Sequence, residues 1–132
     1  MPNDYYEYRG VYDFWRFPLV YPYSLYCIDA TDNGQIRSEK GIKDLKEGGF
    51  IEPLTEYFDL FTLDKSFFVG HICAGHFEHD KVIKPESFFI FSFADGKITN
   101  FQGIAKIKKE LKRIKFTGSL KLMSIREYDE KL

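Results

Sequence analysis

Three histidines and one cysteine lie close together in the sequence, and their side chains are the most suited to chemistry. The chain has no other histidine, and the group is His71, Cys73, His76 and His79. Imidazole and thiolate groups are the usual zinc ligands in proteins. The spacing matches no standard zinc module, and there is no second cysteine pair nearby. We therefore treat the four residues only as candidates for a metal site, and we expect no metal or other cofactor.

The same window allows a nucleophilic pair. On a β-strand, His71 and Cys73 are two residues apart and so lie on one face. A thiol beside an imidazole can act as a nucleophile. However, the sequence contains no motif that would orient such a pair, and free cysteines are mostly buried. We predict no catalytic residue, and we keep a small enzyme or metal site around His71, Cys73 and His76 as an alternative.

Two predicted β-hairpins position this window. Residues 58–63 and 66–74 are rich in aromatic and β-branched side chains and are separated only by Asp64-Lys65. Residues 74–86 then form a connection longer than most hairpin loops, and we predict an irregular loop there. This loop contains His76 and His79, while His71 and Cys73 lie on the strand before it.

The second hairpin has the clearest turn. Residues 87–94 and 97–101 flank Asp95-Gly96, a dipeptide typical of a two-residue hairpin turn. Apolar residues occupy both faces of the strand at 87–94, so we predict a central strand that is covered on each side.

A basic amphipathic helix is predicted over residues 103–115. Its apolar residues recur at the spacing of one helical face, namely Ile104, Ile107, Leu111 and Ile114. Gly118 follows, where a left-handed C-terminal cap is expected. We predict that this helix packs on the sheet.

The first 26 residues are rich in tyrosine and phenylalanine, and Pro18 and Pro22 interrupt them. Since proline cannot donate to a sheet ladder, this region is an edge strand, a wrapping arm or a strand broken by turns. We expect part of it to pack on the core. Trp15, Tyr21 and Tyr23 are candidates for an aromatic contact with a partner.

Shorter elements complete the prediction. Residues 24–29 and 35–38 read as strands around the turn signal Asn33-Gly34. A turn or two of helix is expected at 42–46, and a last edge strand at 120–124. Ser124 and Glu127 form a capping-box pattern, which predicts a short C-terminal helix that ends near Leu132.

Length and composition indicate one α+β domain over residues 1–132. We expect a mostly antiparallel, twisted sheet of about five to seven strands, with the 103–115 helix packed on it and the short C-terminal helix. The chain is 44% hydrophobic and 30% charged, which is ordinary for a globular protein. Its two cysteines do not form a disulfide framework. No apolar run could span a bilayer, so we predict a cytoplasmic protein without membrane contact.

The predicted helix also contains the densest positive charge. The candidates for partner binding on it are Lys106, Lys108, Lys109, Lys112 and Arg113. Such a face could follow a phosphate backbone, which gives the alternative of a nucleic-acid-binding protein that uses residues 106–115. The net charge of the whole chain is −1, however, and nucleic-acid binders are more often basic throughout.

We therefore predict a small, non-catalytic protein-binding module, with an immunity-type or inhibitor protein that neutralises a partner as its specific form. The partner is another protein, bound through complementary charge. Binding of nucleic acid and the small enzyme or metal site remain the two alternatives.

Overall fold

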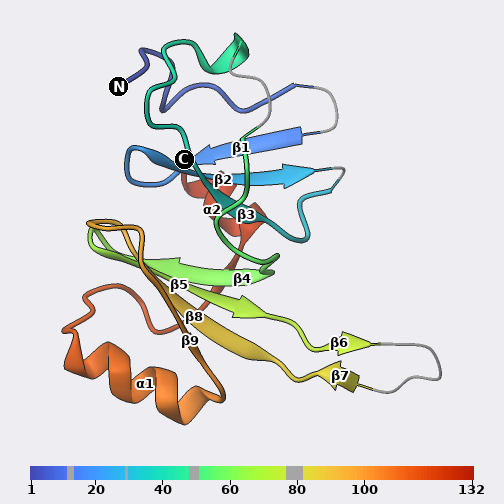
Figure 1. Ribbon diagram of the computed structural model, residues 1–132, viewed down its shortest axis with the longest axis vertical. Helices are drawn as coiled ribbons and strands as arrows, with labels where there is room; N and C mark the ends of the chain where they lie inside the picture. Colours follow the sequence, from blue (N-terminus) through green and yellow to red (C-terminus); the bar gives the residue numbers. More distant parts are fainter. Residues whose placement is uncertain (12–13, 29, 48–50, 77–81) are drawn as a thin grey trace. The chain divides into compact units, whose positions relative to one another are not determined.

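The computed structural model (Figure 1) describes residues 1–11, 14–28, 30–47, 51–76 and 82–132. The chain divides into two compact units, and each contains its own sheet. The first unit is Met1–Tyr57 with Ile125–Leu132, and the second is Phe58–Ser124. Within these ranges every strand pairing is antiparallel and two α-helices accompany the strands, so the predicted α+β class is confirmed. The strands form sheets of three, five and two strands rather than one sheet.

The first unit contains the three-stranded sheet. Its strands are β1 (Phe14–Pro18), β2 (Tyr23–Ile28) and β3 (Gln35–Ser38), in the order β1-β2-β3. The edge-strand prediction is therefore correct for the N-terminal region, and Pro18 lies at the end of β1, where a missing donor costs little. The strands predicted at 24–29 and 35–38 correspond to β2 and β3, and residue 29 lies outside the described residues.

Two short helices belong to the same unit. The 3₁₀ helix η1 spans Leu45–Glu47, and α2 spans Ile125–Lys131, as the capping-box pattern predicted. The hydroxyl of Tyr128 on α2 donates to the carbonyl of Pro18 at 2.7 Å. This bond connects the C-terminal helix to strand β1. No helix of the described ranges is long and apolar enough to cross a membrane.

The second unit contains the five-stranded sheet, in the order β10-β4-β5-β8-β9. Its strands are β4 (Leu60–Leu63), β5 (Phe67–Ile72), β8 (Ser87–Ser92), β9 (Ile98–Phe101) and β10 (Met123–Ser124). Both predicted hairpins are present. The last edge strand is shorter than predicted, since only two residues of 120–124 pair with β4.

β8 is an inner strand with apolar residues on both faces. On one face, Phe89 lies in a cluster of phenylalanine rings with Phe58, Phe61 and Phe68, whose centroids are 4.9 to 6.0 Å apart. On the other face, Phe88 and Ile90 pack with the helix. This alternation confirms the expected central strand.

Helix α1 spans Ile104–Arg113 and packs on that second face through Ile107 and Leu111 (Figure 1). Ile114 is partly buried against the same cluster. Ile104 differs from the prediction, because it lies at the first residue of the helix and its side chain is exposed. The helix is therefore amphipathic as predicted, but only its middle and C-terminal end are packed on the sheet.

The C-terminus of α1 differs from the prediction. The residue in the left-handed conformation is Lys115, with φ of 58°, and not Gly118. The amide of Lys115 donates to the carbonyl of Lys112 at 3.2 Å, and that of Phe116 donates to Leu111 at 3.0 Å. These two bonds are a Schellman motif, in which glycine is the preferred residue at the left-handed position.

Replacing Lys115 by glycine is therefore expected to stabilise the protein. A side chain in the left-handed conformation costs about 1–2 kcal/mol, and the greater freedom of glycine in the unfolded chain cancels about 0.5–1 kcal/mol of the gain. We expect the free energy of unfolding to rise by about 0.5–1 kcal/mol, measured by urea denaturation. Lys109→Gly, in the exposed interior of the same helix, is the control and should destabilise by about 1 kcal/mol.

Both hairpin connections are longer than the predicted two residues, and the β4–β5 register ends at the pair Leu63–Phe68. In the first, the Asp64 carboxylate accepts from the amides of Ser66 and Phe67, each at 2.8 Å. The other oxygen of this carboxylate accepts from the amide of Thr117 at 2.9 Å, beyond the end of α1. In the second, the ladder ends at the pair Phe91–Ile98, so the connection is wider than Asp95-Gly96.

The prediction of an irregular loop at residues 74–86 is wrong in part. Two short strands, β6 (Gly75–His76) and β7 (Val82–Lys84), pair within it, with a register shift at Gly75 and His76. They continue the adjacent strands β5 and β8 (Figure 1). A shift of register interrupts the regular alternation of side chains between the two faces of a strand. The sequence pattern therefore did not indicate the short strands β6 and β7. Residues 77–81 lie outside the described residues.

Candidate functional site

Three strand ends of the second unit bring together one histidine, one cysteine and two carboxylates. Asp59 directly precedes β4, His71 and Cys73 lie at the end of β5, and Glu86 directly precedes β8. In the register of the sheet, Leu60 pairs with His71, and His71 pairs with Phe88. Neighbouring antiparallel strands alternate in direction. The start of β4, the end of β5 and the start of β8 therefore lie at the same end of the strands. We call these four residues the Asp59–Glu86 cluster.

Hydrogen bonds connect all four side chains. His71 Nδ1 lies 2.6 Å from Asp59 Oδ1, and His71 Nε2 lies 2.8 Å from Glu86 Oε2. The thiol of Cys73 donates to Asp59 Oδ2 at 2.8 Å. Each oxygen of Asp59 therefore has a different partner, and the imidazole lies between two carboxylates.

The electrostatics of the cluster follow from these bonds. Burial alone would lower the pKa of His71, but the hydrogen bonds to Glu86 and Asp59 outweigh it and raise the pKa above its ordinary value. Burial would raise the pKa of Asp59, but the bonds from Cys73 and His71 lower it overall. The bond to Asp59, together with burial, raises the pKa of the Cys73 thiol to about 11. The favoured state is an imidazolium between carboxylates beside a protonated thiol.

This arrangement does not favour Cys73 as a nucleophile. Both nitrogens of His71 are directed at carboxylates, and the thiol donates to Asp59 instead of to the imidazole. An activated cysteine needs a lowered pKa or a base that takes its proton, whereas the bond to Asp59 raises the pKa of Cys73 and the imidazole does not accept from the thiol. The structure brings together two of the four metal candidates, His71 and Cys73. The side chain of His76 and the whole of His79 lie outside the description.

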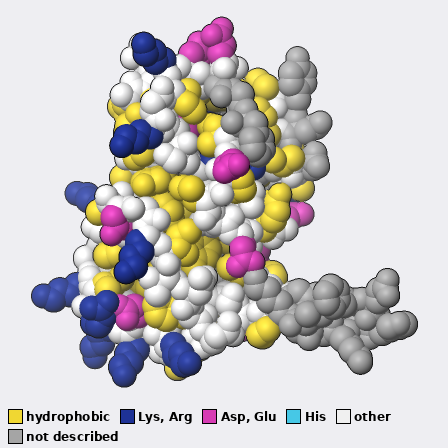
Figure 2. Space-filling model, in the orientation of Figure 1, with side chains coloured by type: hydrophobic (Ala, Val, Ile, Leu, Met, Phe, Trp, Pro, Cys, Tyr) yellow, Lys and Arg dark blue, Asp and Glu magenta, His cyan; other side chains and the backbone are white. Residues whose placement is uncertain are grey.

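A second candidate surface is the exposed face of α1. Figure 2 shows lysine and arginine side chains gathered over this helix. All five predicted partner-binding residues on it are exposed, namely Lys106, Lys108, Lys109, Lys112 and Arg113. The Nε of Arg113 donates to Glu110 Oε1 at 2.6 Å. Among the described residues, no carboxylate forms an ion pair with any of the four lysines.

A groove of about 400 Å³ lies beside this basic face, between α1 and the β8–β9 hairpin. Its apolar residues come from the strands and the helix end, and the charged residues come from the turn and the helix. The lining consists of Phe67, Ile90, Ser92, Asp95, Lys97, Thr99, Phe101, Glu110, Arg113 and Ile114. The two acidic and two basic side chains in this lining balance each other.

Comparisons with protein-family models, curated proteins and solved structures found no match for this chain.

The aromatic candidates for partner binding lie in the first unit. Trp15 is on β1, Tyr23 begins β2, and Tyr21 precedes it. All three side chains are half-buried. The ring of Tyr21 makes an edge contact with that of Tyr5, with centroids 5.3 Å apart. The predicted candidates thus fall into two groups, one in each unit.

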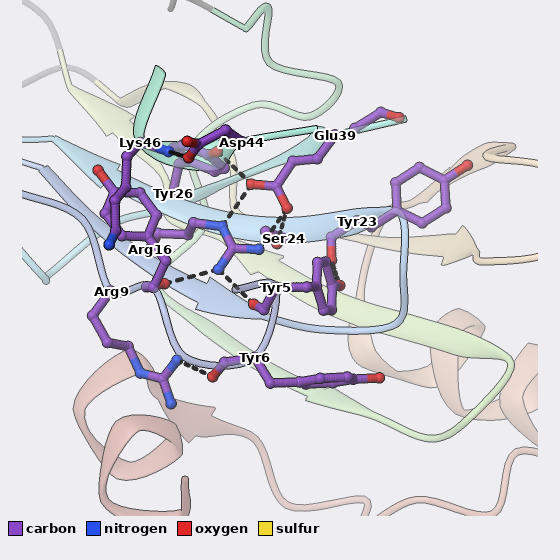
Figure 3. A network of polar contacts seen from close by, with 12 residues as sticks. Tyr5, Tyr6, Arg9, Arg16, Tyr23, Ser24, Tyr26, Glu39, Asp44 and Lys46 are labelled. Atoms are coloured by element: carbon purple, nitrogen blue, oxygen red, sulfur yellow. Dashed lines mark hydrogen bonds and ion pairs between the residues drawn. The ribbon is translucent and has the colours of Figure 1, made fainter. Parts of the chain in front are cut away.

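The first unit also contains a buried ion pair that the sequence analysis did not anticipate (Figure 3). Arg16 on β1 and Glu39 after β3 are both completely buried. The guanidinium Nε and Nη2 each donate to one oxygen of the Glu39 carboxylate, at 2.6 Å in both cases. Ser24 and Tyr26 on β2 also donate to this carboxylate from their hydroxyls.

The third nitrogen of the Arg16 guanidinium also has partners. Nη1 donates to the carbonyls of Tyr5 and Tyr8, at 2.7 and 2.8 Å. The guanidinium lies over the Tyr5 ring, 4.9 Å from its centroid. Since every oxygen of Glu39 and most donors of Arg16 have partners, this network is suited to holding the N-terminal segment on the sheet. It contains no free base or acid that could act on a substrate.

Proposed function

We propose that this chain is a small, non-catalytic, cytoplasmic protein-binding module that docks on an acidic protein partner. The docking surface consists of the exposed lysines of α1 and the groove beside them. The observation that carries the proposal is the basic face of α1 beside a groove lined by four apolar side chains and by two acidic and two basic ones. Protein interfaces have this composition, with an apolar centre and a polar edge.

The charge distribution supports a protein partner. The first unit contains 13 acidic and 8 basic residues, a net charge of −5. The second contains 7 acidic and 11 basic residues, a net charge of +4. Charge of one sign on the docking unit steers an oppositely charged partner into contact and disfavours others.

The groove is the reason to prefer protein over nucleic acid. Its apolar lining residues, Phe67, Ile90, Phe101 and Ile114, suit an apolar side chain of a protein partner, which a phosphate backbone does not offer. Protein surfaces that bind nucleic acid are mainly positive, because affinity depends on the release of counterions from phosphates. An acidic peptide or protein surface with an apolar side chain can form ion pairs with Lys97 and Arg113 and place the apolar side chain against the apolar lining of the groove.

The specific form that we propose is an inhibitor or immunity-type protein, which neutralises its partner by covering a functional surface. Small size and strong charge asymmetry suit such a role, since association must be fast as well as tight. The free thiols of Cys27 and Cys73 suit a reducing compartment such as the cytoplasm.

The proposal is tested by photo-crosslinking from the groove in cells of the source organism. A benzophenone side chain at Thr99, which lines the groove, is expected to crosslink to one acidic protein, identified by mass spectrometry. Asn100 is the matched control position, because it is exposed on the same strand but points to the opposite face. Crosslinks to nucleic acid alone would favour the alternative function, and equal crosslinking at both positions would contradict a groove-centred interface.

Charge reversal then tests the basic face. With the purified partner, Lys108→Glu/Lys109→Glu/Lys112→Glu should lower the affinity by at least about tenfold, which is about 1.4 kcal/mol. The control is Lys40→Glu/Lys43→Glu/Lys46→Glu, which reverses three exposed lysines of the first unit. It makes the same change in net charge, and we expect the affinity to stay within about twofold. An equal loss in both variants would show that only net charge matters.

A further inference from the structure

We propose that the Asp59–Glu86 cluster is a site for a divalent transition-metal ion of the Zn²⁺ type, held by Asp59, His71 Nδ1 and Cys73. Glu86 would not bind the ion but would hold the imidazole. This site is distinct from the α1 face and groove, and it does not depend on the function proposed above.

The donor set is the first argument. One carboxylate oxygen, one imidazole nitrogen and one thiol sulfur lie within 4.8 Å of one another. Nitrogen and sulfur donors with a single carboxylate are the ligands that Zn²⁺ prefers, whereas Mg²⁺ and Ca²⁺ require mainly oxygen. His71 lies on β5, Asp59 directly precedes β4 and Cys73 directly follows β5. The amide of Asp59 donates to the carbonyl of His71 at 3.1 Å, which holds the start of β4 beside the end of β5.

The second argument is the position of Glu86. A histidine that binds a metal through one ring nitrogen almost always donates its other N–H to a carboxylate or carbonyl. In this structure Nδ1 points to Asp59, and Nε2 lies 2.8 Å from Glu86 Oε2. The imidazole is therefore oriented with Nδ1 toward the prospective ligands and Nε2 toward its supporting carboxylate.

The proton balance is simple. With Asp59 ionised, the short contacts of His71 Nδ1 and Cys73 Sγ to its two oxygens each need one proton on the nitrogen or sulfur. A bound ion takes the place of both hydrogens, so two protons are released to solvent and no oxidant or reductant is needed. The donor atoms, now at hydrogen-bond distances of 2.6 and 2.8 Å, must separate by several tenths of an ångström through side-chain rotation.

Three protein ligands leave one position of a tetrahedral ion open. Cys73 is exposed, so water or a ligand from a binding partner can reach it. A site of this composition at a strand end, on the surface, suits an ion that is exchanged or shared with a partner.

The test is titration of the tag-free protein with Co²⁺ and Zn²⁺. Co²⁺ bound to a thiolate gives an intense sulfur-to-metal absorption band, which Zn²⁺ should abolish by displacement. Cys73→Ser should eliminate the band and Cys27→Ser should retain it, since Cys27 is buried in the first unit. Asp59→Asn keeps the size of the side chain and should lose most of the zinc affinity.

The supporting role of Glu86 has its own readout. Glu86→Gln should weaken zinc binding by about 10–100-fold without removing the cobalt–thiolate band. The site is overturned if the wild-type protein gives no band at saturating Co²⁺. It is also overturned if Asp59→Asn and Cys73→Ser bind Zn²⁺ as the wild type does while His76→Gln or His79→Gln does not, because binding would then lie elsewhere. Circular dichroism of each variant establishes that it is folded.

Discussion

Replacing Arg16 by methionine is expected to lower the free energy of unfolding by about 3–5 kcal/mol, measured by urea denaturation. The change leaves the completely buried Glu39 carboxylate without its charge partner. It also leaves the carbonyls of Tyr5 and Tyr8 without the donors of the guanidinium. Both losses act in the same direction, because buried charges and buried carbonyls each need a partner.

The exposed pair of Arg113 and Glu110 provides the matched control. The change is the same, Arg113→Met, but the arginine side chain is 73% exposed. We expect a loss of less than about 1 kcal/mol there. A similarly small loss for Arg16→Met would contradict the structural role of the buried network.

The double variant Arg16→Met/Glu39→Leu is informative in its own right. Replacing a whole buried ion pair with apolar residues is often neutral. In this protein it should remain destabilising, since the hydroxyls of Ser24 and Tyr26 would both lose their acceptor. If the double variant proved as stable as the wild type, the polar neighbours would contribute little.

The Phe89→Ala variant is expected to lower the free energy of unfolding by about 3–5 kcal/mol, again measured by urea denaturation. Phe89 is an inner residue of β8, and its ring packs against Phe58 and Phe68. It also covers Gly70 on the neighbouring strand, with which it is paired. A Cβ atom on Gly70 would lie only 2.2 Å from the Phe89 ring.

This close approach makes Gly70 and Phe89 a coupled pair. Gly70→Ala alone should cost about 1–3 kcal/mol, because the ring must move. In the Phe89→Ala background the same glycine change should be nearly neutral, since the space above it is empty. A double-mutant cycle measures this coupling, and additive effects of the two changes would contradict the packing described.

The sequence predicted those elements whose signals are local. The prediction of β8 was correct because its alternation places phenylalanines on both faces. The prediction of α1 was correct because Ile107 and Leu111 recur at the helical spacing. The capping-box pattern at Ser124 correctly predicted α2. The end of α1 was predicted wrongly because a non-glycine residue, Lys115, adopts the left-handed conformation there.

The features that were missed depend on register between distant strands. His71 and Cys73 were identified from their spacing, but Asp59 and Glu86 join them only through the pairing of β4, β5 and β8. Likewise, Glu39 follows an exposed-looking polar stretch and is paired with Arg16, which is 23 residues earlier. Charged residues in such stretches are usually solvated, so nothing in the sequence indicates that this pair is buried.

The Asp64 carboxylate, which accepts from the first hairpin turn and from Thr117, also affects how a partner would bind. Through this one side chain, the segment after α1 is fixed to the β4–β5 turn, and Thr62 on β4 donates to the carbonyl of Ser119 at 2.7 Å. The C-terminal end of α1 is the end that contributes Glu110, Arg113 and Ile114 to the groove. The backbone on this side of the groove is thus held in place by the fold itself, so a partner of the kind proposed would not have to order it on association.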